Sequence, residues 1–385
     1  MECEFTPPLR DDLIGLTAYG APQLDVPVRL NVNENPFPIP GDVVQAIVDA
    51  VRACARDLNR YPDREALELR QSLVSYLLEE SGVELTAEQI WPANGSNEVM
   101  QHLFQAFGGP QRSVVTFEPT YSMYAEYART TCTNYRPVTR SKDFTLDLER
   151  NLPMLAELAP TLVVVASPNN PTGTTTPIDQ IRELAAAVET WSGIVVVDEA
   201  YIEFRRPGTP SCLELLASFA NLVVTRTLSK AFGLAGTRIG YAVANPAIVD
   251  GIKLVRLPYH LSAVSQAVSC AALAHRGEMR AQVEVLRDQR DDLYAWLVAM
   301  GWEVLPSDAN FLTFGTFVDR DLAWQGLLDA GVLVRATGPT GYLRVSVGTP
   351  PENARFKAAL QDLEQAGHRS GRHPARGDGD ATSTS

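Results

Sequence analysis

The stretch Thr225–Gly240 decides the fold and reads TRTLSKAFGLAGTRIG. In it, Lys230 follows an apolar strand-like run and two hydroxyl residues, Thr227 and Ser229, and Arg238 comes shortly after. Apolar surroundings disfavour the charged form of a lysine, which makes its amine available as a nucleophile and base. Thr227, Ser229 and Arg238 can together bind one phosphate. A solvent-reaching lysine beside a helix cap would explain a lone Ser-Lys pair, but the full set favours a reactive site.

The composition of the 385 residues is that of a folded protein, with 45% hydrophobic and 21% charged residues. General disorder is therefore excluded, and the length predicts two or three domains. No apolar run approaches the ~18–20 residues that a membrane span needs. The net charge of −13 argues against nucleic acid or an anionic membrane surface as a partner. The charge does not exclude small anionic molecules as ligands, because a few well-placed arginines can bind one.

The cysteines and the start of the chain both predict a cytoplasmic protein. The five cysteines are scattered and form no CxxC pair, so we expect reduced thiols rather than disulfides, and no metal site. The first residues, Met1–Glu4, are acidic, unlike a signal peptide.

Strand-like and helix-like segments alternate through the middle of the chain. Unbroken β-branched runs between helices predict strands buried on both faces, and hence a mostly parallel α/β sheet. The predicted strands are 113–117, 162–166, 194–197, 222–225 and 239–243, followed by 311–314 and 343–347. The predicted helices lie within 40–58 and 67–77 and over 178–188, 213–219 and 281–300.

These segments divide the chain into an N-terminal arm, two domains and a tail. Residues 1–30 form the arm, and 31–285 form a large domain whose first segment, 31–45, contributes to the small domain. Residues 286–366 form a small α+β domain. Residues 367–385 are rich in Gly, Ser, Arg and His and are expected to be disordered.

Four further motifs carry polar residues at the ends of predicted elements. Ala93–Glu98 precedes an amphipathic helix, whose free N–H groups suit a phosphate, although an ordinary helix cap is the alternative. Tyr121 follows a strand, where core packing is the usual role. Asn170 lies in an Asn-Pro segment, which also fits a plain turn. Asp198 ends an apolar strand, a costly place for a carboxylate unless a cation pairs with it or it caps a helix.

In this order the motifs resemble those of the fold type I pyridoxal-phosphate aminotransferases. The resemblance implies a large domain with a seven-stranded, mostly parallel sheet between helices, and a smaller α+β domain. It implies that Lys230 binds the cofactor covalently and moves protons, that Asp198 pairs with the ring nitrogen, and that Tyr121 stacks on the ring. Tyr201 and Asn170 would bind the ring oxygen. The residues implied at the phosphate are Gly95, Ser96, Asn97, Thr227, Ser229 and Arg238.

Both ends of the chain resemble the histidinol-phosphate aminotransferase subfamily. The segments that carry this resemblance are 30–36 (LNVNENP), 60–63 (RYPD), 257–262 (LPYHLS), 331–335 (GVLVR) and 343–353 (LRVSVGTPPEN). It implies a homodimer of histidine biosynthesis that converts L-histidinol phosphate and 2-oxoglutarate to imidazole acetol phosphate and L-glutamate. Tyr61 would reach the cofactor phosphate of the neighbouring subunit. The implied substrate contacts are Tyr19, Asn35, Tyr259, Arg335 and Arg344.

The chemistry of the substrates agrees with this subfamily. Histidinol phosphate presents a phosphate, whereas 2-oxoglutarate presents two carboxylates, and arginine binds both in bidentate fashion. Arg335 and Arg344 flank a Gly-Pro turn that can bring them to one site.

Two other functions stay open. An aromatic or branched-chain aminotransferase, or a threonine-phosphate decarboxylase, would share the cofactor motifs, and only the arginines and tyrosines argue against them. A cofactor-binding regulator would need an added DNA-binding module, and the negative charge disfavours one. His260 is expected to pack or form hydrogen bonds, because Lys230 already serves as the base.

Overall fold

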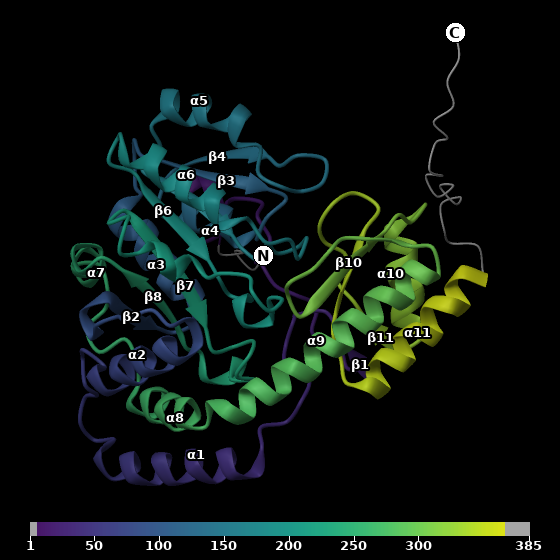
Figure 1. Cartoon of the computed structure of the whole chain (residues 1–385), viewed down its shortest axis with the longest axis horizontal. Helices are drawn as coiled ribbons and strands as arrows, with labels where there is room; N and C mark the ends of the chain where they lie inside the picture. Colours follow the sequence, from purple (N-terminus) through teal and green to yellow (C-terminus); the bar gives the residue numbers. More distant parts are fainter. Residues whose placement is uncertain (1–5, 366–385) are drawn as a thin grey trace, which may run out of the picture.

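The computed structural model describes residues 6–365, and its larger part is built on a seven-stranded sheet (Figure 1). In spatial order its strands are β2 (Ile90–Ala93), β8 (Gly240–Ala244), β7 (Leu222–Thr227), β6 (Ile194–Asp198), β5 (Leu162–Ala166), β3 (Ser113–Glu118) and β4 (Asn134–Thr139). Strand β8 pairs antiparallel with both neighbours, and the other pairings are parallel. The predicted mostly parallel seven-stranded sheet is confirmed. The predicted tail, residues 367–385, lies outside the described residues.

Both faces of this sheet are covered by helices. Successive side chains of a strand point to opposite faces, so Val163 and Val165 enter one hydrophobic cluster and Val164 enters the other. Helices α2 (Leu67–Ser81), α5 (Leu148–Leu158), α6 (Ile178–Glu189) and α8 (Ala263–Ala274) contribute buried residues to the first cluster, and α1 (Gly41–Cys54) packs against it. Helices α3 (Ser96–Phe107), α4 (Met123–Thr130) and α7 (Pro246–Lys253) contribute to the second. This burial explains the unbroken apolar strands.

A smaller part carries a third hydrophobic cluster. Its antiparallel sheet has the order β12 (Leu343–Ser346), β10 (Phe311–Gly315) and β9 (Glu303–Val304), and β1 (Val28–Arg29) pairs in parallel with β11 (Val332–Leu333). Helices α10 (Arg320–Asp329) and α11 (Pro350–Gln365) pack beside these strands. The long helix α9 (Arg276–Ala299) joins the two parts, because Leu286 belongs to the first cluster and Leu293 to the third (Figure 1). The residue boundaries expected for the two domains stay predictions.

The structure differs from the sequence predictions in two kinds of element. The helix predicted over 213–219 is a short 3-10 helix, Cys212–Leu215. Strands β2 and β4 are absent from the predicted strands; they contain Pro92 and Pro137, and proline lacks the N–H that a central strand uses. Both strands form the edges of the sheet, where a missing N–H is tolerated. Within residues 6–365, no helix combines the length and apolarity that crossing a membrane requires.

A buried ion cluster lies behind the ends of β6 and β7. The side chain of Arg226 is fully buried and donates to Glu80 at 2.8 Å and to Glu199 at 2.9 Å. Glu199 is itself buried, so each charge depends on the others for its stability.

We expect Arg226→Met to lower the free energy of unfolding by about 3–5 kcal/mol, because it leaves buried carboxylates without a counter-charge. The matched control is Lys253→Met, which removes the partially exposed Lys253–Asp250 pair and should cost roughly 0–1 kcal/mol. Urea denaturation of both variants measures the difference. Equal losses would show that the buried cluster contributes no more than a surface pair.

Candidate active site

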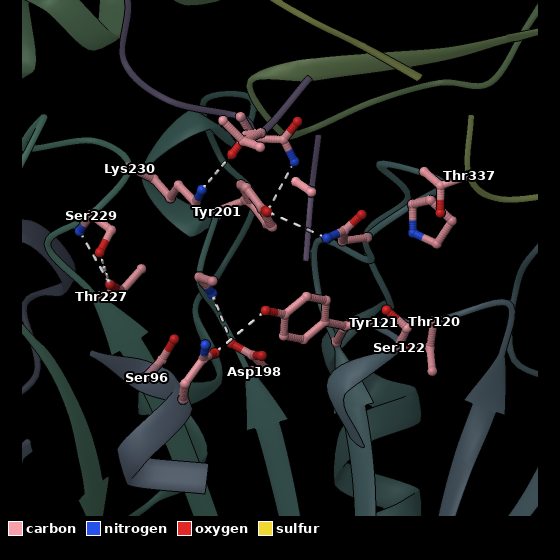
Figure 2. A pocket seen from close by; sticks show the side chains of 18 of the residues that line it. Ser96, Thr120, Tyr121, Ser122, Asp198, Tyr201, Thr227, Ser229, Lys230 and Thr337 are labelled. Atoms are coloured by element: carbon pink, nitrogen blue, oxygen red, sulfur yellow. Dashed lines mark hydrogen bonds between the residues drawn. The ribbon is translucent and has the colours of Figure 1, made fainter. Parts of the chain in front are cut away.

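A cavity of about 290 Å³ opens at the carboxyl ends of β5, β6 and β7 and at the N-terminus of α3. Open parallel sheets bind their ligands at this edge. The smaller part of the chain also contributes to the lining, through Arg335 and Arg344, and so does the segment 31–33. Figure 2 shows Ser96, Thr227, Ser229 and Lys230 on the left, Thr337 on the right, and Asp198 between them.

Lys230 faces this cavity. Its Nζ donates to the carbonyl oxygen of Val32 at 2.8 Å and lies 5.9 Å from the ring centroid of Tyr201. Burial, together with the positive charges of Arg344 and Arg238, lowers the pKa of Lys230 to about 8. About a tenth of the amine is therefore uncharged at pH 7, far more than for an ordinary lysine, and this form is the one that a nucleophile or base requires.

Asp198 lies at the carboxyl end of β6 and is buried. Its carboxylate accepts from the hydroxyl of Tyr124 at 2.8 Å and from the N–H of Ala200 at 3.2 Å. Both partners are neutral, and burial raises the pKa of Asp198. A ligand that brings a positive charge to this carboxylate would stabilise its ionised form.

One end of the cavity is built to bind an anion. Thr227 Oγ1 donates to Ser229 Oγ at 3.0 Å, and Arg238 Nη1 donates to the same oxygen at 3.4 Å. Helix α3 begins beside them at Ser96, where the first N–H groups of a helix favour negative charge. Gly95 has φ +82°, and a Cβ atom there would lie 2.4 Å from Nη2 of Arg238. The glycine therefore makes room for the arginine.

The other end carries Arg344 and Arg335. Arg344 is 6% exposed and donates through Nη2 to the carbonyl oxygen of Asn31 at 2.8 Å and through Nη1 to Asn170 Oδ1. Its Nε has no hydrogen-bond partner within residues 6–365, so a ligand acceptor would satisfy it. The two arginines pair through their backbones across the Gly-Pro turn, and both line the cavity. The prediction that this turn brings them together is confirmed.

Tyr201 connects the two ends. Its hydroxyl accepts from Asn33 Nδ2 at 3.0 Å and from Asn170 Nδ2 at 3.5 Å. Three polar groups from distant segments thus meet beside Lys230, where they can bind an oxygen of a ligand.

Most of the predicted site residues line this one cavity. They are Tyr19, Ser96, Asn97, Tyr121, Asn170, Asp198, Tyr201, Thr227, Ser229, Lys230, Arg238, Arg335 and Arg344. Gly95 lies against Arg238, as described above. Tyr61 and Tyr259 lie elsewhere and stack on each other, with ring centroids 4.4 Å apart, and Tyr61 is 79% exposed.

Asn35, predicted as a substrate contact, lies outside the lining, and Asn33 occupies the site instead. In a regular extended segment both asparagines would share a face. Asn33 has φ +55°, which breaks this alternation. The Asn35 amide donates to Gln282 Oε1 at 3.0 Å and to the Ala231 carbonyl at 3.3 Å, so it ties the segment to neighbouring structure.

Sequence reasoning also missed Tyr124 and Gly240. Tyr124 follows Tyr121 by three residues, which is helical spacing and could have indicated a shared site. A Cβ atom at Gly240 would lie 2.1 Å from the backbone nitrogen of Ser96, so glycine allows α3 to approach β8. His260 packs as expected: its ring stacks on that of Trp91, with the ring centroids 5.1 Å apart.

Comparison with known proteins defines the class. Residues 26–360 match the family model of the aminotransferases of class I and II. Histidinol-phosphate aminotransferase 3 of Burkholderia lata is 54% identical over 356 residues, which cover 92% of this chain and 95% of that protein. The histidinol-phosphate aminotransferase of Thermobifida fusca is 52% identical over 353 residues, covering 92% and 94%.

A solved structure agrees with these sequence matches. The histidinol-phosphate aminotransferase of Sinorhizobium meliloti, in complex with pyridoxal-5'-phosphate, superposes with a TM-score of 0.79 at 26% identity. The match covers 89% of this chain and 92% of that one. The chain therefore belongs to the class I and II aminotransferases and, within them, to the histidinol-phosphate aminotransferase family.

The lowered pKa of Lys230 predicts selective chemical labelling in the cofactor-free protein. At pH 8 about half of the Lys230 amine is uncharged, whereas an ordinary lysine with a pKa near 10.4 has well under 1% in that form. We expect an amine-acylating reagent at pH 8 to modify Lys230 faster than the exposed Lys142. Peptide mass spectrometry measures the two rates. Slower labelling of Lys230 at both pH 7 and pH 9 would contradict the shift.

Proposed function

We propose that the chain catalyses the pyridoxal-phosphate-dependent transamination of L-histidine biosynthesis. It would convert L-histidinol phosphate and 2-oxoglutarate to imidazole acetol phosphate and L-glutamate. The observation that carries this proposal is the position of the Lys230 amine between two anion-binding groups, one around Arg238 and one around Arg344. A phosphorylated cofactor and an anionic substrate would each occupy one of them.

The residues present fit pyridoxal phosphate. Arg238, Ser229 and Thr227, with the N-terminus of α3, would hold its phosphate, and Tyr121 would stack on its ring. Asp198 would face the ring nitrogen. The positive charge of that nitrogen would stabilise the carboxylate, whose hydrogen-bond donors in the protein are neutral. Asn170 and Tyr201 would bind the ring oxygen. When bound, the cofactor supplies an aldehyde for the amino group and a ring that accepts an electron pair.

The chain's own residues would hold and move the protons. With a pKa of about 8, the Nζ of Lys230 can take a proton from the substrate α-carbon and return it to another carbon. The Val32 carbonyl holds that nitrogen in place. Burial of Asp198 keeps water from competing for its carboxylate, and Arg344 orients the substrate through its anion.

The substrate preference would depend on the second arginine. Asn170 and the Asn31 carbonyl hold the Arg344 side chain in position, and its Nε has no hydrogen-bond partner within residues 6–365. Arg344 would therefore bind the anion of either amino donor. Arg335 adds a second guanidinium, which suits the phosphate of histidinol phosphate.

The homodimer that we propose rests on an exposed apolar surface. Two neighbouring segments carry it, since Tyr61 stacks on Tyr259 and Arg256 donates to the Arg64 carbonyl at 3.1 Å. Its exposed residues are Leu58, Tyr61, Leu254, Leu257 and Tyr259. A second copy would cover this surface and would place Tyr61 near the neighbouring cavity. The free thiols of Cys54, Cys132, Cys212 and Cys270 fit the cytoplasmic location that we propose.

We expect Lys230→Ala to abolish transamination and to leave the fold intact, because the residue supplies the base but contributes little to the hydrophobic core. Turnover of histidinol phosphate and circular dichroism measure the two effects. Wild-type turnover in this variant would refute the proposed function.

The two arginines should differ in their effect on substrates. Lysine keeps the charge but loses the bidentate geometry, so each substitution should lower kcat/KM roughly 10- to 150-fold for the donors that it binds. Arg344→Lys should impair histidinol phosphate and glutamate alike. Arg335→Lys should impair histidinol phosphate more. Equal losses for Arg335→Lys would favour an aminotransferase of another specificity, and turnover of phenylalanine then tests the aromatic alternative.

A hybrid dimer tests the contribution of Tyr61. The separate variants Tyr61→Ala and Lys230→Ala should both be inactive, but each mixed dimer would contain one complete site. After subunit exchange we expect about a quarter of the wild-type activity. Confirmed exchange without recovery would show that each subunit builds its site alone.

A further inference from the structure

A second cavity, of about 260 Å³, lies between α2, α9 and the segment after β6. The proposed reaction uses none of its lining residues. The lining carries four carboxylates, four guanidiniums and an apolar wall. The acids are Glu79, Glu80, Glu203 and Glu284; the bases are Arg205, Arg206, Arg280 and Arg287; and the wall is Tyr76, Met279 and Val283.

Glu203 offers an unsatisfied acceptor to this cavity. Its side chain is 6% exposed, and Oε1 accepts from the hydroxyl of Tyr76 at 3.3 Å. Oε2 has no hydrogen-bond partner within residues 6–365. Burial raises the pKa of Glu203 to about 7, which is the expected consequence of such surroundings. A buried carboxylate oxygen without a partner is costly, and a ligand donor would remove that cost.

Arg287 offers an unsatisfied donor beside it. Its Nη2 donates to the backbone carbonyl of Glu203 at 2.6 Å, so the two residues are adjacent. Its Nε is buried and has no partner within the described part of the chain. The other three arginines of the lining are already paired with carboxylates, Arg205 with Glu80, Arg206 with Asp308 and Arg280 with Glu79.

We propose that this cavity binds the zwitterion of a small amino acid with an apolar side chain. The ammonium group donates to Oε2 of Glu203, the carboxylate accepts from Arg287, and the side chain packs on Tyr76, Met279 and Val283. The balanced charges of the lining favour such a neutral zwitterion over a simple anion or cation.

The cavity is connected to the active site by short paths. Glu203 lies in the short 3-10 helix Ile202–Phe204, and Tyr201, which lines the catalytic cavity, is the residue that precedes this helix. Glu80 accepts from Arg226, which also binds Glu199, the neighbour of Asp198. The proposed ligand site is thus distinct from the catalytic cavity but lies against the same strand ends.

Calorimetric titration of the cofactor-loaded protein tests the proposal. The probes are N-methylglycine, L-proline and N-methyl-L-leucine, secondary amines that keep the ammonium and carboxylate but are unsuited to transfer of their nitrogen. We expect at least one to bind saturably. L-prolinamide and N-acetyl-L-proline, which lack the carboxylate and the ammonium respectively, should bind at least about 10-fold more weakly than L-proline.

Variants assign the binding to this cavity. Glu203→Gln and Arg287→Met should each weaken it about 10-fold or more, whereas Glu284→Gln, on the exposed rim, should not. Arg287→Met decides the matter if Glu203→Gln fails to fold. The proposal is overturned if no probe binds, or if binding survives both substitutions. Binding that Arg344→Lys removes would belong to the active site and would also overturn it. The measurement is of binding alone, so its outcome does not depend on the proposed reaction.

Discussion

The structure depends above all on one buried guanidinium, that of Arg226 in β7, which binds Glu199 and Glu80. Glu199 directly follows Asp198 at the end of β6, and Thr227 directly follows Arg226. In the low dielectric of the interior, fully satisfied charges of this kind are strongly coupled. The cluster therefore fixes the spacing between the two strand ends that carry Asp198 and the Lys230 loop. It also joins them to α2, so the edge of the sheet and its covering helix act as one unit.

The charges of the active site oppose those of the whole chain. The chain has a net charge of −13, yet the cavity is lined by four cations and one acid. These are Lys230, Arg238, Arg335, Arg344 and Asp198. After burial, repulsion from Arg344 and then from Arg238 contributes to the lowered pKa of Lys230. An anion bound at either arginine weakens that repulsion, so anion binding and protonation of the lysine are thermodynamically linked. The cavity thereby attracts anions and, in the reaction that we propose, would ready Lys230 to accept a proton from the substrate.

The sequence predicts the parts of the structure that local pattern determines. Strands such as β5 and β6 are predictable because their β-branched runs are buried on both faces. Several residues of the cavity are predictable because they end such a strand, as Asp198 and Thr227 do, or begin a helix, as Ser96 does. The place of Asn33 in the site was not predictable from the sequence, because it depends on a distant residue. The backbone N–H of Asn33 donates to Ser346 Oγ at 2.9 Å, and its side chain accepts from that hydroxyl. That contact joins residues far apart in the sequence, and no local pattern reveals the left-handed backbone that accompanies it.

The segment 31–33 explains how the larger and the smaller part of the chain together form one site. The carbonyl of Asn31 accepts from Arg344, which belongs to the smaller part, and the carbonyl of Val32 accepts from Lys230, which belongs to the larger. Asn33 donates to Tyr201. Two of these three contacts use backbone oxygens, so an apolar residue such as Val32 can lie in a polar cavity and still position the lysine. The two carbonyls belong to successive residues, so this one segment holds the side chains of Arg344 and Lys230 on the same cavity.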